Sequence, residues 1–211
     1  MDLDTPLFEG ELVYLAPIKP DQDAEIESQW THDAEFQRML GEELIRPLSP
    51  AQIKKNYAEI EKEMDEKGTQ FYFAIRHLPI GKSTAAVNPM DQDSDLLLGF
   101  AKLDWIAWNH GVGSLSLGIG SPEERGKGYG SDALRLLLGY AFRELNFFRV
   151  STTIPEYNQV ALHVSEKAGF KVEARRREAI HRLGRRWDML HLGLLRKEWQ
   201  QGEWRTMRAQ S

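Results

Sequence analysis

Hydrophobic side chains recur with a helical period in some segments of the chain and gather in short runs in others. Between Ser49, a good helix cap, and Gly68, which ends helices, apolar residues stand three or four positions apart. Residues 129–145 show the same spacing, and their apolar face consists of Leu134, Leu137, Leu138, Ala141, Phe142 and Leu145. Residues 21–30 and 159–168 are also predicted to be helical.

Short runs rich in β-branched and aromatic residues predict the strands. These runs are residues 11–18, 70–77, 96–108, 113–121, 147–154, 170–181 and 185–195. A turn at residues 109–113 joins two of them, which suggests an antiparallel meander.

The chain is expected to form a single domain over residues 9–199. Residues 1–8 and 200–211 are expected to be terminal tails, the second of them irregular after Trp199. Residues 79–95 are polar and rich in turn formers, which predicts an exposed insertion.

The composition of the chain excludes several classes of partner and of mechanism. The 211 residues carry a formal net charge of -5 and include no cysteine. The acidic balance disfavours nonspecific nucleic-acid binding, and no run of ~20 apolar residues predicts a membrane span. Without cysteine, zinc thiolate sites and acyl transfer through a protein thiol are excluded. We therefore expect a cytoplasmic protein with neither a nucleic-acid nor a membrane partner.

A glycine-rich loop precedes the predicted helix 129–145, in the stretch SPEERGKGYGSDALRLLLGYAF. Gly126, Gly128 and Gly130 stand at alternate positions, where their backbone N–H groups can turn toward a ligand beside the positive end of a helix. Arg125 and Lys127 add positive charge, so an anion is the expected occupant. A glycine-rich turn with no ligand is the alternative interpretation.

Two phosphate-binding motifs do not fit. The glycine spacing is not that of the dinucleotide fingerprint, which has two residues before its last glycine. The GKST of residues 81–84 imitates the end of a P-loop, but Arg76 stands where the first glycine belongs.

Arg125, Gly128 and Gly130 spell Arg-x-x-Gly-x-Gly, which resembles the acyl-CoA-binding motif of the GNAT family of N-acetyltransferases. NQVALHVSEKAGF, residues 158–170, is similar to a second segment of that family in spacing and order. RREAIHRLGRRWDMLHLGLLRKEW resembles the C-terminal hairpin of its ribosomal-protein N-terminal acetyltransferase branch. The resemblance covers about residues 9–199.

The resemblance implies an α/β (α+β) fold, with a mixed, mostly antiparallel sheet of about seven strands and helices on both faces. It also implies that two neighbouring parallel strands, within 114–120 and 149–154, part to admit the pantetheine arm of acetyl-CoA. We expect Gly118 and Gly120 to favour a bulge there, although strand glycines also simply weaken strands. The expected contacts of acetyl-CoA are Leu117, Gly118, Ile119, Arg125, Gly126, Lys127, Gly128, Tyr129, Gly130, Ser131 and Asn158.

Without cysteine, the acceptor amine must attack the bound thioester directly. An α-amino group (pKa ~7.7 to 8.0) is closer to neutral at pH 7 than a lysine side chain (~10.4), which mildly favours a polypeptide N-terminus as acceptor. The family often places a tyrosine near the leaving thiolate, seven residues after the asparagine; here that position is Ser165. Asp104 and Glu43 are candidate general bases, and no metal site is indicated.

Several alternatives stay open from the sequence alone. The acceptor can instead be a small amine such as an amino acid, a polyamine or an antibiotic. A noncatalytic acyl-CoA-binding domain is the rival class of function, and both a monomer and a homodimer fit. Asn158 and Ser165 also have purely structural interpretations, as a helix cap and as a polar helix residue.

Overall fold

One seven-stranded sheet organises the protein. The structure, a computed structural model, describes residues 7–41, 44–79 and 95–202. The strands are β1 (Val13–Ala16), β2 (Phe71–His77), β3 (Leu97–Ala107), β4 (Val112–Ile119), β5 (Arg149–Pro155), β6 (Lys171–Arg182) and β7 (Arg185–Leu195). Their order across the sheet is β1-β2-β3-β4-β5-β7-β6, and every neighbouring pair except β4 and β5 is antiparallel.

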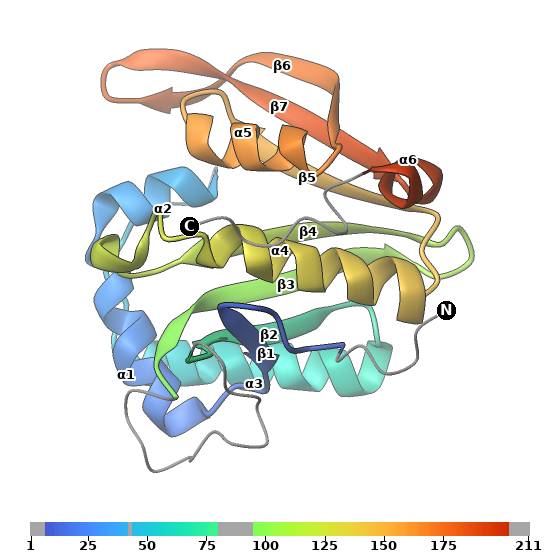
Figure 1. Cartoon of the computed structure of the whole chain (residues 1–211). Helices are drawn as coiled ribbons and strands as arrows, with labels where there is room; N and C mark the ends of the chain where they lie inside the picture. The colour runs from blue at the N-terminus through green and yellow to red at the C-terminus, as the bar shows by residue number, and fades with distance from the viewer. Residues whose placement is uncertain (1–6, 42–43, 80–94, 203–211) are drawn as a thin grey trace.

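Helices cover both faces of this sheet. They are α1 (Pro20–Trp30), α2 (Ala34–Leu40), α3 (Pro50–Lys67), α4 (Tyr129–Gly139), α5 (Gln159–Lys167) and α6 (Arg196–Gln201), and a π-helical turn, Tyr140–Glu144, extends α4. In Figure 1, α4 and α5 lie in front of the sheet, and α1 and α3 lie behind it. The described elements confirm the fold class that the sequence predicts.

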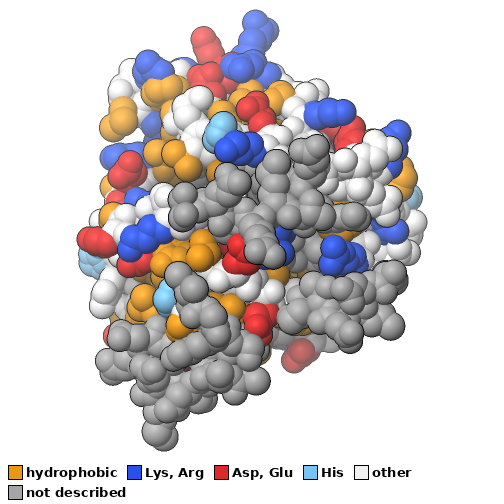
Figure 2. Space-filling view, viewed as in Figure 1, with side chains coloured by type: hydrophobic (Ala, Val, Ile, Leu, Met, Phe, Trp, Pro, Cys, Tyr) orange, Lys and Arg blue, Asp and Glu red, His pale blue; other side chains and the backbone are white. Residues whose placement is uncertain are grey.

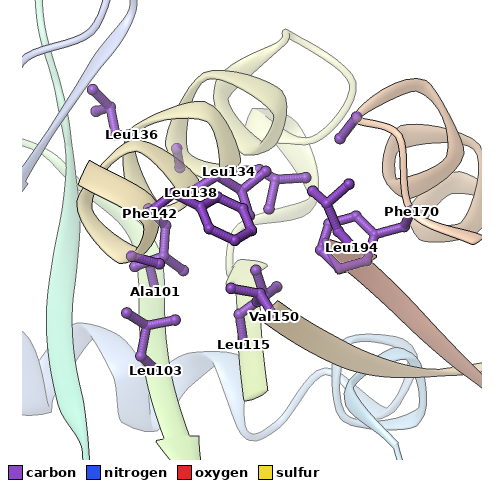
Figure 3. Close-up of a cluster of buried hydrophobic side chains, with 14 of the residues drawn as sticks. Ala101, Leu103, Leu115, Leu134, Leu136, Leu138, Phe142, Val150, Phe170 and Leu194 are labelled. Carbon is purple, nitrogen blue, oxygen red and sulfur yellow. The ribbon is translucent and has the colours of Figure 1, made fainter. Parts of the chain in front are cut away.

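The main core lies between the sheet and α4. Leu134, Leu138 and Phe142 pack from the helix and its extension against side chains such as Leu115 of β4 and Val150 of β5 (Figure 3). All five are at most 6% exposed. The apolar face read from the sequence is therefore the face that the helix buries, and this burial stabilises it.

Sequence patterns predict the long elements better than the short ones. The capping box of Ser49 and Gln52 and the left-handed Gly68 bound α3 as expected. The seven-residue α2, however, is not predicted, because it is too short to show a period. The expectation of an irregular chain after Trp199 is wrong as far as Gln201, where α6 ends.

Buried charges fix Asp95, the last residue of the predicted insertion 79–95. Arg76 donates two hydrogen bonds to Asp23 at 2.9 and 2.8 Å, and both side chains are 2% exposed. Arg76 also donates to the carbonyl oxygen of Asp95 at 3.1 Å, and Asp95 accepts a hydrogen bond from Tyr14. Most of the predicted insertion, residues 80–94, lies outside the described residues.

Candidate active site

The two parallel strands in the middle of the sheet part along their length. Strands β4 and β5 pair only at Val112 with Arg149, Gly113 with Val150 and Ser114 with Ser151. Beyond these pairs β4 pairs only with β3, and β5 only with β7. The result is a fork that is closed at Ser114 and opens toward Ile119 and Pro155.

The glycine-rich loop lies at the open end of this fork and presents backbone donors. The N–H of Arg125 donates to the Pro122 carbonyl, and the N–H of Asp132 donates to that of Gly128. Within the described part of the chain, the six N–H groups from residue 126 to residue 131 donate no hydrogen bond to another backbone group. With the N-terminus of α4 directly behind them, these donors form a site for an anion.

Two glycines of this loop have backbone angles that other residues rarely adopt. Gly126 has φ 77° and Gly128 has φ 89°, both in the left-handed region. A Cβ on Gly128 would also lie 3.2 Å from the side chain of Leu12. Gly130, in the first turn of α4, would bring a Cβ within 3.8 Å of Leu117 and Ile119, so the start of the helix rests on the end of β4.

The guanidinium group of Arg125 does not face the anion site as the sequence suggests. It donates to Asp33, the N-cap of α2, at 2.6 Å, and to the carbonyl oxygens of Ile119 and Gly120 at 3.2 and 2.6 Å. Burial acts to raise the pKa of the Asp33 carboxyl, but hydrogen bonds from Arg125 and from backbone N–H groups hold it below its usual value. The arginine therefore joins the end of β4 to α2, and its charge is already paired.

The other charge of the loop is also partnered. The Lys127 ammonium donates to Glu124 at 3.0 Å, and this hydrogen bond raises the pKa of Lys127. Lys127 is exposed, so it can turn toward a ligand at little cost. Tyr129 and Ser131 lie in the first turn of α4, and their N–H groups are among the six that donate no hydrogen bond to another described backbone group.

Gly118 of β4 and Gly120, which directly follows this strand, serve close packing, and the predicted bulge is wrong. The pairing of β3 with β4 runs without interruption from Gly99 with Ile119 to Asp104 with Ser114. A Cβ on Gly118 would lie 3.0 Å from the ring of Phe36, and a Cβ on Gly120 would lie 2.0 Å from the ring of Trp30. Helices α1 and α2 therefore approach the end of β4 so closely that side chains do not fit there.

Helix α5 begins at the open end of the fork. The side chain of its N-cap Asn158 accepts a hydrogen bond from the Ala161 N–H and donates to the Met39 carbonyl at 3.0 Å. The Tyr157 hydroxyl donates to the Arg38 carbonyl at 2.7 Å. Adjacent residues thus join the start of α5 to the end of α2 across the mouth of the fork. Two turns into α5, Ser165 is 7% exposed, on the same buried side as Leu162.

The face of the sheet that lies opposite α4 and α5, which we call the α1–α3 face, carries polar side chains at the fork. Strand alternation places Asp104 and Lys102 of β3 there, joined by an ion pair of 2.8 Å. Thr153 of β5 and His191 of β7 lie beside each other on this face, with 3.3 Å between the threonine hydroxyl and Nδ1 of the imidazole. These groups form a polar, partly exposed floor.

The candidate bases are not brought together. Asp104 pairs with Ser114, level with the closed end of the fork, and its carboxylate is engaged by Lys102. Glu43 lies outside the described residues.

Sequence reasoning missed Asp132, a carboxylate that anchors the start of α4 directly after the glycine-rich loop. Asp132, in the first turn of α4, is 2% exposed and accepts hydrogen bonds from the N–H groups of Glu11, Leu12 and Val13 at 2.8, 2.8 and 3.1 Å. Arg135 donates to its other oxygen at 2.6 Å. An acidic residue in the first helical turn was the available signal, but the three N–H groups that it binds lie more than 100 positions away in the chain.

Among the described residues no cluster of His, Asp and Glu side chains is arranged to hold a metal ion. None of the described helices combines the length and apolar character needed to cross a membrane.

Comparison with known proteins identifies the family. Residues 13–171 match the acetyltransferase (GNAT) domain. The chain is 30% identical to an N-acetyltransferase 9-like protein of Caenorhabditis briggsae over 163 residues, which cover 77% of this chain and 76% of that protein. It is 35% identical to a putative ribosomal N-acetyltransferase of Bacillus subtilis over 78 residues, 37% of this chain and 43% of the relative.

A solved structure shares the fold. The spermidine N-acetyltransferase of Vibrio cholerae in complex with CoA and spermine superposes with a TM-score of 0.70 at 19% identity, covering 89% of this chain and 98% of the other. The chain belongs to the GNAT acetyltransferase family, and the expectation of an acetyl-CoA-dependent acetyltransferase is confirmed.

Proposed function

We propose that this member of the GNAT family transfers the acetyl group of acetyl-CoA to the N-terminal α-amino group of a polypeptide, as its ribosomal-protein branch does. The observation that carries the proposal is the fork between β4 and β5, with six backbone N–H groups at its open end. It offers a thioester a slot between two strands and offers a pyrophosphate a set of donors at a helix N-terminus.

The residues of the loop fit the acyl donor in a definite way. The pyrophosphate is proposed to accept hydrogen bonds from the N–H groups of residues 126–131, with the exposed Lys127 adding charge. The pantetheine arm would follow the unpaired edge of β4 along Leu117, Gly118 and Ile119, beside Asn158. Arg125 is proposed to support the loop rather than touch the phosphate, because Asp33 already holds its guanidinium.

The bonds that form and break during acetyl transfer define which group each side of the fork must supply. The acceptor nitrogen forms a bond to the thioester carbonyl carbon, the carbon–sulfur bond breaks, and the nitrogen loses a proton while the departing thiolate gains one. Ser165 is proposed to donate a hydrogen bond to that sulfur from α5. Asp104 and Glu43 are the carboxylates proposed to receive the proton of the amine, and Asp104 must first release Lys102.

The acceptor is proposed to arrive from the α1–α3 face. Helices α4 and α5 and their core close the other face. Because no cysteine is present, both substrates must be bound together, and an α-amino group needs less help from a base than a lysine does. The sequence likeness to a putative ribosomal N-acetyltransferase supports a polypeptide acceptor.

A polyamine is the second candidate acceptor. The observation in its favour is the structural likeness to a spermidine N-acetyltransferase with spermine bound, although that likeness at 19% identity extends only to the fold.

A panel of acceptors tests the choice. The purified chain is incubated with acetyl-CoA and with peptides bearing a free N-terminus, the same peptides with a blocked N-terminus and an internal lysine, and spermidine. We expect release of CoA chiefly with the free N-terminal peptides. Faster turnover of spermidine than of every peptide would favour the polyamine, and the same assay on Asp104→Asn tests the proposed base.

A further inference from the structure

The tip of the β6–β7 hairpin is strongly basic in an acidic protein. Residues 176–186 contain five arginines and one glutamate, whereas the whole chain has a net charge of -5. Lys and Arg side chains project from the end of the molecule where Figure 1 places this hairpin (Figure 2). Arg176, Arg177, Arg185 and Arg186 are exposed.

The arginines of the hairpin differ in their partners. Arg175, next to the tip, is neutralised by Glu156 and Asp188 at 3.1 and 2.8 Å, whereas Arg186 donates to the carbonyl oxygen of Glu178, which is uncharged. The guanidinium of Arg185 stacks on the ring of Trp187. Stacking on an indole orients a guanidinium without neutralising it, so Arg185 presents its charge in a fixed place.

Trp187 connects the hairpin to the mouth of the fork. Its indole N–H donates to the Arg182 carbonyl at 3.2 Å, and its ring contacts that of Tyr157 with 5.2 Å between centroids. Tyr157 directly precedes Asn158, the N-cap of α5. The basic tip is therefore attached beside the fork, on the carboxyl side of β5.

A further arginine, Arg38 at the end of α2, lies on the other side of Tyr157. The Tyr157 hydroxyl donates a hydrogen bond to the Arg38 carbonyl. Burial raises the pKa of Tyr157, while the positive charges of Arg182 and Arg38 act to lower it. We call Arg38, whose carbonyl group contacts Tyr157, and Arg185, which stacks on Trp187, the basic rim.

The register of β7 relates the rim to the polar floor. Arg185, Trp187 and His191 alternate on one face of the strand, the α1–α3 face that also carries Thr153. At ~3.3 Å per residue, Trp187 lies ~13 Å and Arg185 ~20 Å along the strand from His191. An extended polypeptide advances by the same amount per residue. If its amine lies at the fork beside Thr153 and His191, about its fifth to seventh residues reach the rim.

We infer that the basic rim binds carboxylate side chains of the acceptor, so that the preferred substrate is a polypeptide with acidic residues near its fifth to seventh positions. The inference rests on the proposed acetylation of a polypeptide N-terminus. A polyamine would bring cations to this rim and be repelled. A long nucleic acid would meet the acidic remainder of the protein, whereas a few carboxylates need only the rim.

The test compares peptides that differ only in the place of their acidic residues. Each has about 12 residues, a free N-terminus and otherwise neutral side chains, the length being set by the ~20 Å reach. One carries Asp-Glu at its sixth and seventh positions, one carries Asn-Gln there, and one carries Asp-Glu at its tenth and eleventh. For the first peptide we expect kcat/KM roughly 5- to 10-fold above both others, falling toward theirs as salt rises.

Charge reversal at the rim assigns the effect to these residues. Arg38→Glu/Arg185→Glu should remove or invert the preference. Lys55→Glu/Lys62→Glu changes the net charge equally on the exposed side of α3, remote from the hairpin in Figure 1, and should retain it. CoA affinity, measured by calorimetry, should be unchanged in both variants and also shows that they are folded.

The outcomes separate the two proposals. No turnover of any peptide would refute the proposed function itself. Turnover of all three peptides at equal rates by the wild-type chain would overturn the inference about the rim and leave the function standing. Loss of CoA affinity in the rim variant would assign the arginines to the cofactor, and tighter binding of a labelled RNA oligonucleotide than of the acidic peptide would also overturn the inference.

Discussion

The two sides of the fork differ in the groups that they present: backbone N–H groups on one side and side chains on the other. Where the acyl donor is proposed to bind, backbone N–H groups of residues 126–131 supply the hydrogen-bond donors. The nearby charges of Arg125 and Lys127 are paired with Asp33 and Glu124. Where the acceptor is proposed to bind, side chains such as Thr153, His191 and the basic rim form the surface. Backbone donors suit a donor molecule that never changes, while side chains can be altered one at a time to suit an acceptor.

This contrast predicts that the largest effect comes from changing the backbone of the loop. Gly128→Val should weaken CoA binding by at least ~100-fold, because valine disfavours φ 89°, meets Leu12 and displaces several N–H donors together. Calorimetry with CoA measures the change.

A matched glycine controls for backbone strain. Gly68 also has a positive φ, and no atom of the described residues lies close enough to meet its Cβ within 4 Å, but it caps α3, outside the fork. Gly68→Val should lose stability and retain CoA affinity. A folded Gly128→Val protein that binds CoA as tightly as the wild type would refute the placement of the pyrophosphate.

Ser165 gives the next largest effect and tests whether one side chain on the donor side acts in the reaction. Ser165→Ala should lower kcat by ~10- to 100-fold and leave CoA affinity nearly unchanged, because a hydrogen bond to sulfur strengthens as charge develops there. Steady-state kinetics with a slow acceptor, for which chemistry limits the rate, would show the separation.

Ser28 offers the control for loss of a buried hydroxyl. It is also 7% exposed, but it lies on α1 and donates to the Glu25 carbonyl. Ser28→Ala should leave kcat unchanged. If Ser165→Ala behaves in the same way, the proton donor lies elsewhere and Ser165 has only a structural role.

The same contrast explains what the sequence could predict. Gly126 and Gly128 are required by their own backbone angles, so a local motif was enough to find the loop. The partner of Arg125 is Asp33, 92 positions away, and α2, which places that partner, has only seven residues. Thr153 and His191 meet only because β7 inserts between β5 and β6, an order that no local pattern encodes. Arrangements that depend on such pairings became visible only in the structure.

The smallest expected effect on CoA affinity is that of Arg125. Because its guanidinium faces Asp33 and two carbonyl groups, Arg125→Ala should change the Kd for CoA less than about 3-fold while lowering the free energy of unfolding by about 1–2 kcal/mol at pH 7. Asp33→Asn isolates the charge, since asparagine still caps α2.

The pH dependence follows from the lowered pKa of Asp33. A carboxylate whose pKa is lower in the folded state stabilises the protein above its unfolded value of ~3.9, and this contribution is lost as the pH falls through the folded value. The difference in unfolding free energy between the wild type and Asp33→Asn should therefore be largest near neutral pH and shrink below about pH 4. Urea unfolding at several pH values measures it. A large loss of CoA affinity in Arg125→Ala, with this stability difference absent, would mean that the arginine turns to the phosphate after all and would remove the contrast between the two sides of the fork.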